Sequence, residues 1–405
     1  MRNSSLKLEI ISPPSWPARL LPAWSNLLEQ TATASIFLSP EWIGAWWRAY
    51  GEGHEPRLWA VWNEQGALVA LAPFYIVKMR VGGLLDLPVI RFMGDEGGGA
   101  EYLGLLAESG REEEVLQSLA GAMGSQCALV DIRGLPEGDA LTRLIPKMFG
   151  ERAPWPIHEE RHACSRVLLP DDYEAYLRSL RSKFRSSLRY QTNRLVKNHN
   201  ARLLRTSAEE DLDAHLDRFF AMHQERWVTR GDTGSFHDPR KLAFYREIAA
   251  AFLRRGWLRF YHLEVDKVIR ASQFGFAYRG TLYSLQEAID HSFHPPGVDG
   301  FGVVLRGMAI RESITEGLGA YDFLGGVEEF KTRWGTIPHY IHRVEIGIGL
   351  AGSLTLAGLV GWRLVKNWGR THAPDWLRKA RHFFRPPTAS HQSHQSSLEF
   401  REEEN

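Results

Sequence analysis

Two acids lie in predicted strands, where they could act on a substrate. Glu287 closes the strand TLYSLQEAI, and Asp322 lies within the short strand YDFLGG. A carboxylate at the end of a central strand, next to an anion-binding loop, can serve as a general base. Asp322 can equally be a structural acceptor for loop amides. The whole segment 321–334, YDFLGGVEEFKTRW, is either a substrate-facing loop or a turn with a solvated edge.

A glycine-rich loop, HPPGVDGFG, separates the strand that ends near Glu287 from a predicted helix. Gly297, Gly300 and Gly302 leave backbone N–H groups accessible beside the N-terminus of that helix. Such amides, together with the helix dipole, form an anion site suited to a pyrophosphate. Glycines that only cap and turn the chain are the alternative.

A long predicted helix over residues 171–198 carries a basic cluster. Asp171 or Asp172 is its expected N-cap. Arginines three or four residues apart share one of its faces, namely Arg178, Arg181, Arg185 and Arg189. This face is either simply solvated or binds an anionic ligand. Nucleic acid is disfavoured, because the net charge of the chain is only +1 and few aromatic side chains interleave with the cluster.

A second polar group ends another predicted helix, in the segment AMHQERWVTRGDTGSF. His223, Arg226 and Trp227 enter a loop that is broken by glycines, and side chains at such a corner can line a pocket. Packing of Trp227 under the helix end is the alternative. No serine–histidine–aspartate spacing, CxxC, HExxH or Walker loop is present, so the sequence indicates neither a nucleophile nor a metal.

The elements that must position these residues follow an α+β order. A hairpin, a helix near residues 111–123 and a strand form the first half. The second half has three helices and then three strands separated by Asp266-Lys267 and Arg279-Gly280, which predicts an antiparallel meander. Asp238, Pro239 and Gly256 mark the ends of the third helix. With 405 residues, two domains are expected, 1–160 and 161–345.

The remaining residues are an expected helical extension, 346–385, and an expected disordered tail, 386–405. Residues 346–362 carry no charge and the segment that follows is basic and aromatic, so a buried helix and a peripheral membrane contact are both considered. Two cysteines and an N-terminus without a signal-peptide pattern favour a cytoplasmic protein, with membrane association as the variant.

These segments, in this order, resemble the GNAT superfamily, and in detail the CelD/BcsL-type acetyltransferase branch, which is related to Fem-type aminoacyl transferases. The resemblance rests on KFRSSLRYQTNRL, MHQERWVTRG, FYREIAAAFLRRGWLRFYHL, HPPGVDGFGVVL and above all YDFLGGVEEFKTRWG. It covers about residues 169–344. It implies tandem GNAT-like domains with mainly antiparallel sheets and helices on both faces.

The resemblance also implies a function: an acetyl or other acyl group moves from acyl-CoA to an amine or hydroxyl, on a small-molecule or glycan acceptor such as a polysaccharide precursor. Gly297, Gly300, Gly302 and Arg306 would bind the donor phosphates. The expected catalytic residues are Glu287, Asp322 and Lys331, and the expected substrate contacts are His223, Arg226, Trp227, Gln273 and Trp334. The alternatives are a Fem-like transferase that uses aminoacyl-tRNA and a non-catalytic scaffold at the membrane.

Overall fold

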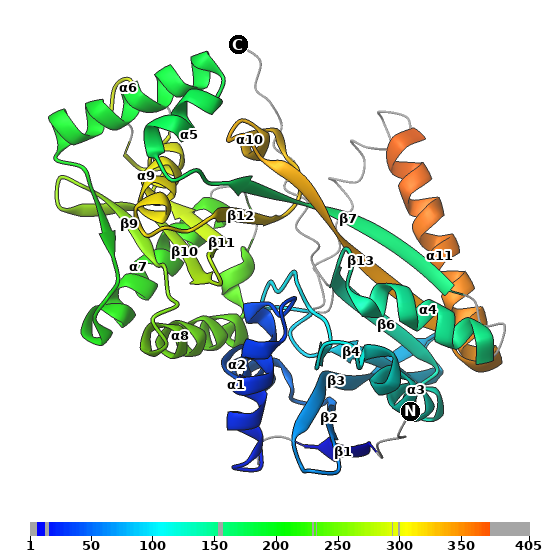
Figure 1. Ribbon diagram of the computed structural model, residues 1–405. Coiled ribbons are helices and arrows are strands. Elements are labelled where there is room, and N and C mark those ends of the chain that lie inside the picture. The colour runs from blue at the N-terminus through cyan, green and yellow to red at the C-terminus, as the bar shows by residue number, and fades with distance from the viewer. Residues whose placement is uncertain are drawn as a thin grey trace.

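One mixed sheet runs through the whole molecule (Figure 1). The computed structural model describes residues 6–12, 16–152, 157–228, 231, 233–293, 295–298 and 300–372. The strands follow the order β1 (Lys7–Ile11), β2 (Glu55–Trp62), β3 (Leu68–Val81), β4 (Leu85–Phe92), β6 (Leu129–Pro136), β13 (Ile337–Gly347), β7 (Ile157–Leu168), β12 (Ala320–Gly325), β11 (Thr281–Ile289), β10 (Val268–Tyr278), β9 (Tyr261–Val265) and β8 (Arg202–Arg205), and the short β5 (Leu106–Ala107) pairs with β3.

Most neighbouring strands are antiparallel, and β9, β10 and β11 form the expected meander. The parallel pairs are β4 with β6 and β11 with β12. The predicted α+β class is confirmed. Strand β7 runs straight through the domain boundary expected near residue 160, and β13 returns from the end of the second half to pair with both β7 and β6. The two halves therefore share a continuous sheet.

Helices cover both faces of this sheet (Figure 1). They are α1 (Leu20–Gln30), α2 (Pro40–Tyr50), α3 (Glu112–Gln126), α4 (Ala140–Arg152), α5 (Tyr173–Ser179), α6 (Ser182–His199), α7 (Glu209–Val228), α8 (Pro239–Arg254), α9 (Phe301–Thr315), α10 (Glu329–Thr332) and α11 (Gly349–His372), with 3-10 turns at Ile36–Leu38 and Ser235–His237. The predicted N-caps hold, since Asp172 accepts from the Ala175 amide and Asp238 from the Arg240 amide.

The prediction of one continuous helix over residues 171–198 is wrong. The structure has two helices there, α5 and α6. Leu180 is extended (ψ 152°) and buried in the core of the second half. The Arg185 guanidinium donates to the carbonyls of Leu177, Arg178 and Leu180, at 3.4, 3.1 and 3.2 Å. These bonds satisfy carbonyls that the end of α5 leaves open. One of the four arginines in the basic cluster is thus used to join two helices.

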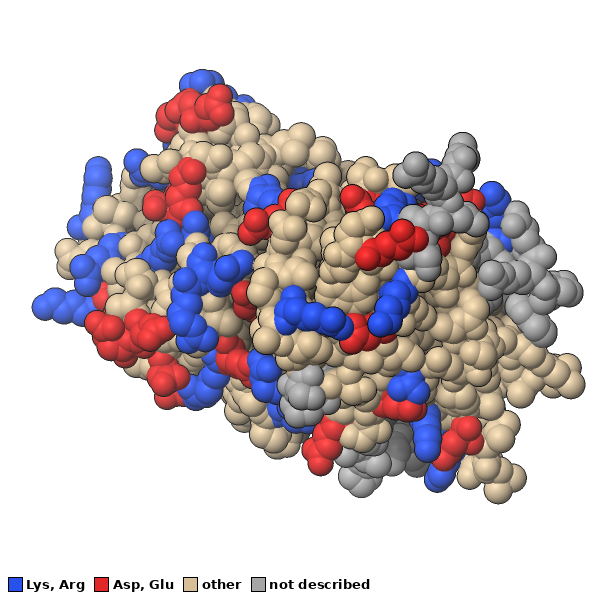
Figure 2. Space-filling view, turned by 60° about the horizontal axis from the view of Figure 1, so that its bottom comes forward, with Lys and Arg blue, Asp and Glu red and all other residues tan. Residues whose placement is uncertain are grey.

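Charged side chains are mixed over the surface. On the face shown in Figure 2, acidic and basic residues are interspersed among uncharged ones, and many acidic groups have a basic neighbour. Ion pairs between surface side chains of the molecule include Arg246–Asp213, Arg80–Asp86 and Arg240–Asp238. This distribution agrees with the net charge of +1 and provides no extended basic surface on that face for a polyanion.

The two halves meet through a shared aromatic core. Trp42 on α2 is fully buried, and its ring lies 5.0 Å from that of Phe244 on α8 and 5.8 Å from that of Phe276 on β10. Phe37 packs edge-on against the same indole at 4.8 Å. Aromatic contacts of this kind contribute beyond the area that they bury. The core of the first half is therefore continuous with helices and strands of the second.

We predict that Trp42→Ala destabilises both halves together. Truncating a buried tryptophan removes transfer energy and leaves a cavity, which costs about 3–5 kcal/mol. Urea unfolding should show one transition with a lower midpoint. Trp362→Ala, at a tryptophan that is exposed on α11, is the matched control and should leave the midpoint unchanged. Two separate transitions in the Trp42 variant, with only the first half weakened, would contradict the shared core.

Candidate functional site

Strands β11 and β12 separate soon after they pair. Their parallel pairing covers Thr281 with Ala320, Leu282 with Tyr321 and Tyr283 with Asp322. Beyond Tyr283, β11 runs on to Ile289 without β12, whereas β12 continues along β7. The backbones of the two parallel strands therefore diverge in a V at their carboxyl ends, with Asp322 at the vertex, and this divergence is called the opening below. Ligands commonly bind at such an edge.

A β-bulge lies in β11 where the opening begins. Gly275 of β10 pairs with Ser284, and its neighbour Phe274 pairs with Gln286, so Leu285 is an extra residue. A bulge leaves the extra residue unpaired and bends the strand. Gly275 is required here, since a Cβ on it would lie 2.4 Å from the Tyr283 carbonyl oxygen. The bulge thus bends β11 beside the opening and leaves backbone groups without a ladder partner.

The glycine-rich loop leads from β11 to the N-terminus of α9, at the same end of the two strands. Gly300 is the N-cap residue and no side chain caps the helix. A Cβ at Gly300 would meet nothing within 4 Å, so the helix end is open. Gly302 has a different reason to be glycine, because a Cβ there would lie 2.7 Å from Ile289 Cδ1. The uncapped amides and the dipole of α9 can receive an anion.

Arg194 of α6 also reaches this loop. Gly297 has a φ of +72°, and a Cβ on it would lie 3.1 Å from Arg194 Cζ. The guanidinium donates to Tyr190 Oη at 2.8 Å, and its Nε has no hydrogen-bond partner among the described residues. Of the basic residues on the long predicted helix, Arg194 is therefore one that contacts the glycine-rich loop.

The vertex of the opening holds a buried chain of three polar side chains. Tyr102 Oη lies 2.9 and 3.0 Å from the two carboxylate oxygens of Asp322 and 2.7 Å from His339 Nε2. The Leu324 amide donates to Asp322 at 2.7 Å. Since the tyrosine proton points to Asp322, His339 must carry its own proton on Nε2 to complete the chain. His339 Nδ1 then remains as an acceptor, and no described residue donates to it.

Burial changes how these groups titrate. It raises the pKa of Asp322 to about 6 and lowers the pKa of His339 to about 4. Near pH 7 Asp322 is therefore mostly ionised and His339 is neutral. Burial also raises the pKa of Tyr102 well above its usual value, so the phenol keeps its proton. A carboxylate that titrates just below neutral pH suits a general base.

A second acid and a lysine flank this chain. Burial raises the pKa of Glu101 to about 7, against the opposing effect of Lys331. Lys331 is buried and donates to the Gly325 carbonyl, and its Nζ lies 3.0 Å from Glu328 Oε2. A Cβ on Gly325 would lie 2.6 Å from Glu101 Oε1. Gly325 is glycine because Glu101 approaches its backbone so closely.

These features agree with the comparisons of the chain with known proteins. Residues 182–332 match the family described as "Acetyltransferase (GNAT) domain". This part of the chain is therefore similar to GNAT acetyltransferase domains. The match confirms the expected GNAT-type acyltransferase. It does not distinguish the CelD/BcsL branch from other branches. No curated protein matches the chain by sequence.

Solved structures support the fold over most of the chain. A crystal structure of FemX is 12% identical with a TM-score of 0.54, and the match covers 83% of this chain and 96% of FemX. A conserved protein of unknown function from Bacteroides thetaiotaomicron is 14% identical with a TM-score of 0.51, over 84% of this chain and 99% of that one. At such identities the likeness concerns the fold alone.

The structure pairs two of the predicted site residues of the GNAT domain with each other. Arg306 donates from Nε to Glu287 Oε1 at 2.6 Å and from Nη2 to Glu287 Oε2 at 2.5 Å. Burial would lower the pKa of Arg306, but the Glu287 carboxylate raises it. A guanidinium held by two bonds has little left to offer a phosphate, and both carboxylate oxygens of Glu287 are already occupied by the same two bonds. This geometry argues against both assigned roles.

The remaining predicted residues divide between the opening and the core. His223 accepts from Gln286 Nε2 on the separated part of β11 at 2.9 Å and from Trp227 Nε1 at 3.4 Å, and burial lowers its pKa to about 3. Arg226 lies in the last turn of the same helix, α7. Gln273 is buried and accepts from Tyr321, and Trp334 is fully buried. Neither is exposed to a substrate, which argues against the contacts expected for them.

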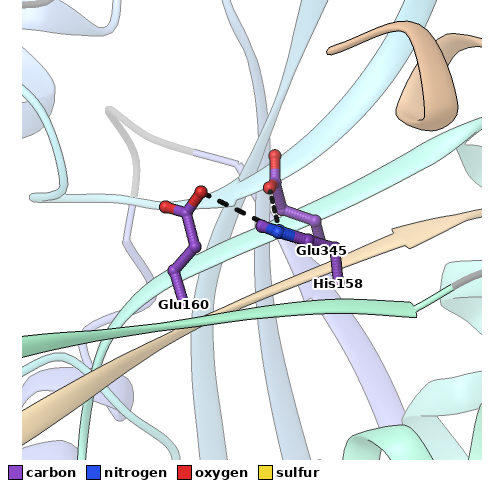
Figure 3. A group of neighbouring side chains, drawn as sticks. All are labelled: His158, Glu160 and Glu345. Carbon is purple, nitrogen blue, oxygen red and sulfur yellow. Dashed lines mark hydrogen bonds and ion pairs between the residues drawn. The ribbon is translucent and has the colours of Figure 1, made fainter. Parts of the chain in front are cut away.

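A cluster of possible metal ligands lies elsewhere, on β7 and β13 (Figure 3). It consists of His158, Glu160 and Glu345, and His158 Nδ1 is 3.2 Å from Glu345 Oε2. Arg343 and Arg363 already bind the same carboxylates: Arg343 Nη2 is 2.9 Å and Arg363 Nη2 is 2.7 Å from Glu345 Oε1. Two guanidinium groups supply the positive charge that a metal would bring. The cluster is better explained as an attachment of α11 to the sheet.

Sequence reasoning missed Glu101, Tyr102 and His339. The first two lie within a second glycine-rich segment, MGDEGGGAEYLGLL, in the first half of the chain. Its distance from Asp322 along the chain, 220 residues for Tyr102, hides the contact.

We predict a pH-dependent stability difference between the wild type and Glu101→Gln. Burial raises the pKa of Glu101 from 4.5 to about 7, so the folded chain holds this proton more tightly than the unfolded chain. The resulting stability is fully present below about pH 4.5 and is lost as the pH rises through 7. Urea unfolding should therefore show the wild type losing stability relative to E101Q over this range. Glu113→Gln, at an exposed position on α3, should show no such trend, and a pH-independent difference for E101Q would contradict the assignment.

Proposed function

We propose that the protein transfers an acyl group from acyl-CoA to an amine or hydroxyl within the opening between β11 and β12. The observation that carries this proposal is the separation of the two parallel strands at Asp322, with the uncapped N-terminus of α9 at the same end. A CoA thioester has the shape and charge for such a site, since its pyrophosphate needs an anion cradle and its pantetheine arm can pair with an open strand.

The donor lies with its pyrophosphate against the first amides of α9 at Gly300. Arg194 adds a positive charge beside Gly297 and takes the phosphate-binding role first considered for Arg306. The unpaired backbone groups of β11 beyond Tyr283 hold the pantetheine arm and the thioester carbonyl. Backbone N–H groups aimed at that carbonyl stabilise the negative charge that develops on its oxygen.

The vertex chain accepts the proton of the acceptor. The acceptor amine or hydroxyl attacks the thioester carbonyl, the new C–N or C–O bond forms, and the C–S bond breaks to release CoA. The proton lost by the acceptor passes to His339 Nδ1, while the Nε2 proton moves to Tyr102 and the tyrosine proton moves to Asp322. The short distances along this chain support the transfer. The CoA thiolate then takes a proton from solvent.

The branch of the superfamily and the class of acceptor are also part of this proposal. The segment YDFLGGVEEFKTRWG supports the CelD/BcsL-like branch, and through that branch a sugar or polysaccharide precursor as the acceptor. The FemX fold, which covers 83% of this chain, favours a second candidate, transfer of an aminoacyl group from aminoacyl-tRNA. The two candidates differ in their donor, so CoA binding distinguishes them.

We predict that CoA and acetyl-CoA stabilise the purified protein, because a ligand that binds only the folded state raises its unfolding temperature. Gly300→Asp should weaken binding by about tenfold or more, since a carboxylate would face the pyrophosphate. Gly300→Ala is the matched control and should bind normally, because its Cβ has open space. Thermal shift and calorimetric titration measure both effects. No stabilisation by saturating CoA would refute the CoA donor and favour the aminoacyl candidate.

We also predict that Tyr102→Phe and Asp322→Asn lower kcat by roughly 100-fold with little change in the affinity for CoA, because each breaks the proton chain. Tyr340→Phe, one residue from His339 on β13, is the control and should retain activity. Release of free thiol from acetyl-CoA in the presence of candidate amines measures the rate. Full activity in both vertex variants would remove the chain from the mechanism.

A further inference from the structure

Helix α11 has one face that is well packed on the sheet. Leu356 is buried against Val89 of β4 and Leu129 of β6. The helix lies so close that a Cβ on Gly352 would be 1.9 Å from the Ala128 carbonyl oxygen. Arg363 completes the attachment through Glu345 and Glu160. These contacts hold α11 in one orientation, so its outer face is also defined.

The outer face of α11 is strongly apolar. Six large apolar side chains on this helix are between 61% and 77% exposed, namely Leu350, Leu354, Trp362, Leu364, Val365 and Trp368. A monomeric soluble protein rarely exposes such a continuous group. Val77 and Met79 of the β3–β4 hairpin pack against the cluster that contains Leu356, and the tip of this hairpin carries Leu84, which is 96% exposed.

The charges beside this apolar face identify what it binds. Between Gly349 and His372 the sequence has Arg363, Lys366 and Arg370 but no aspartate or glutamate. Lys366 is exposed beside the apolar residues. A helix with leucine and tryptophan on one side, flanked by cations without acids, has the composition of helices that lie in the headgroup region of anionic bilayers. Tryptophan rings prefer that same depth.

The chain beyond the helix continues this pattern in its sequence. Residues 373–385 contain four lysines or arginines against one aspartate, together with Trp376, Phe383 and Phe384. Basic residues interleaved with aromatic ones favour an anionic lipid surface over a neutral protein surface. No helix in the described part of the chain is long and apolar enough to span a bilayer.

We propose that the outer face of α11 docks on an anionic lipid bilayer. Figure 1 shows α11 at the opposite end of the molecule from α6 and α9, so a docked protein keeps the opening between β11 and β12 accessible. A second copy of the chain fits this face less well. In a two-fold dimer, the outer face of α11 would pack against the same face of the second copy. Helix α11 has no acid that could pair with the positive charges of the two copies of Lys366. The proposal does not depend on the acyl transfer described above.

The test is sedimentation of the full chain with vesicles of phosphatidylcholine alone or mixed with phosphatidylglycerol. We expect the wild type to pellet with the mixed vesicles and much less with the neutral ones. Leu354→Glu combined with Leu364→Glu should weaken binding at least about tenfold, because it places two charges in the apolar face. Leu21→Glu, at an exposed leucine on α1, is the matched control and should bind as the wild type does.

One further variant and two further measurements complete the test. Lys366→Glu should reduce binding to the mixed vesicles while leaving the weak binding to neutral vesicles unchanged. All of these positions are exposed, so thermal unfolding in the absence of lipid should be the same for every variant. Failure of the wild type to pellet, or undiminished pelleting of the double variant, overturns the proposal. A dimer in gel filtration that the double variant dissociates, without any vesicle binding, would assign the face to a second copy instead.

Discussion

Strand β13 pairs with β7 along nearly its whole length and with β6 on its other edge. This pairing connects the end of the second half to the sheet of the first, and the site depends on it. His339 lies on β13, Asp322 lies on β12 across the intervening β7, and Tyr102 lies on the loop of the first half that reaches both. Without the shared strands these three side chains would belong to separate domains.

Buried carboxyl groups and a strained backbone at the vertex of the opening cost free energy of folding. Asp322 and Glu101 are carboxyl groups among buried apolar side chains, and burial raises the pKa of each. Leu324 has a φ of +59°, a conformation that is strained for a residue with a side chain, and Asp322 holds it through the Leu324 amide. Strain and buried charge at the end of a strand are features that folds usually retain for a function.

Arginine pairing decides which basic residues can bind a ligand. Arg185 joins α5 to α6, Arg306 neutralises Glu287, and Arg363 attaches α11 to β13. Arg194 differs from these three, because its Nε has no described partner and its guanidinium contacts the glycine-rich loop. Arg185, Arg306 and Arg363 therefore have structural roles, whereas Arg194 is available to a ligand.

Local patterns in the sequence determined the elements. The turns at Asp266-Lys267 and Arg279-Gly280 defined the meander, Asp172 and Asp238 began their helices, and the segment HPPGVDGFG marked the open N-terminus of α9. These features depend on residues close together in the chain. Three other features were decided only by the tertiary structure. They are the contacts of Glu101, Tyr102 and His339 with the segment around Asp322, the pairing of Glu287 with Arg306, and the division of α11 into a packed face and an exposed apolar face. Each of them joins side chains from separate elements, and a local pattern carries no information about which surfaces the folded sheet brings together.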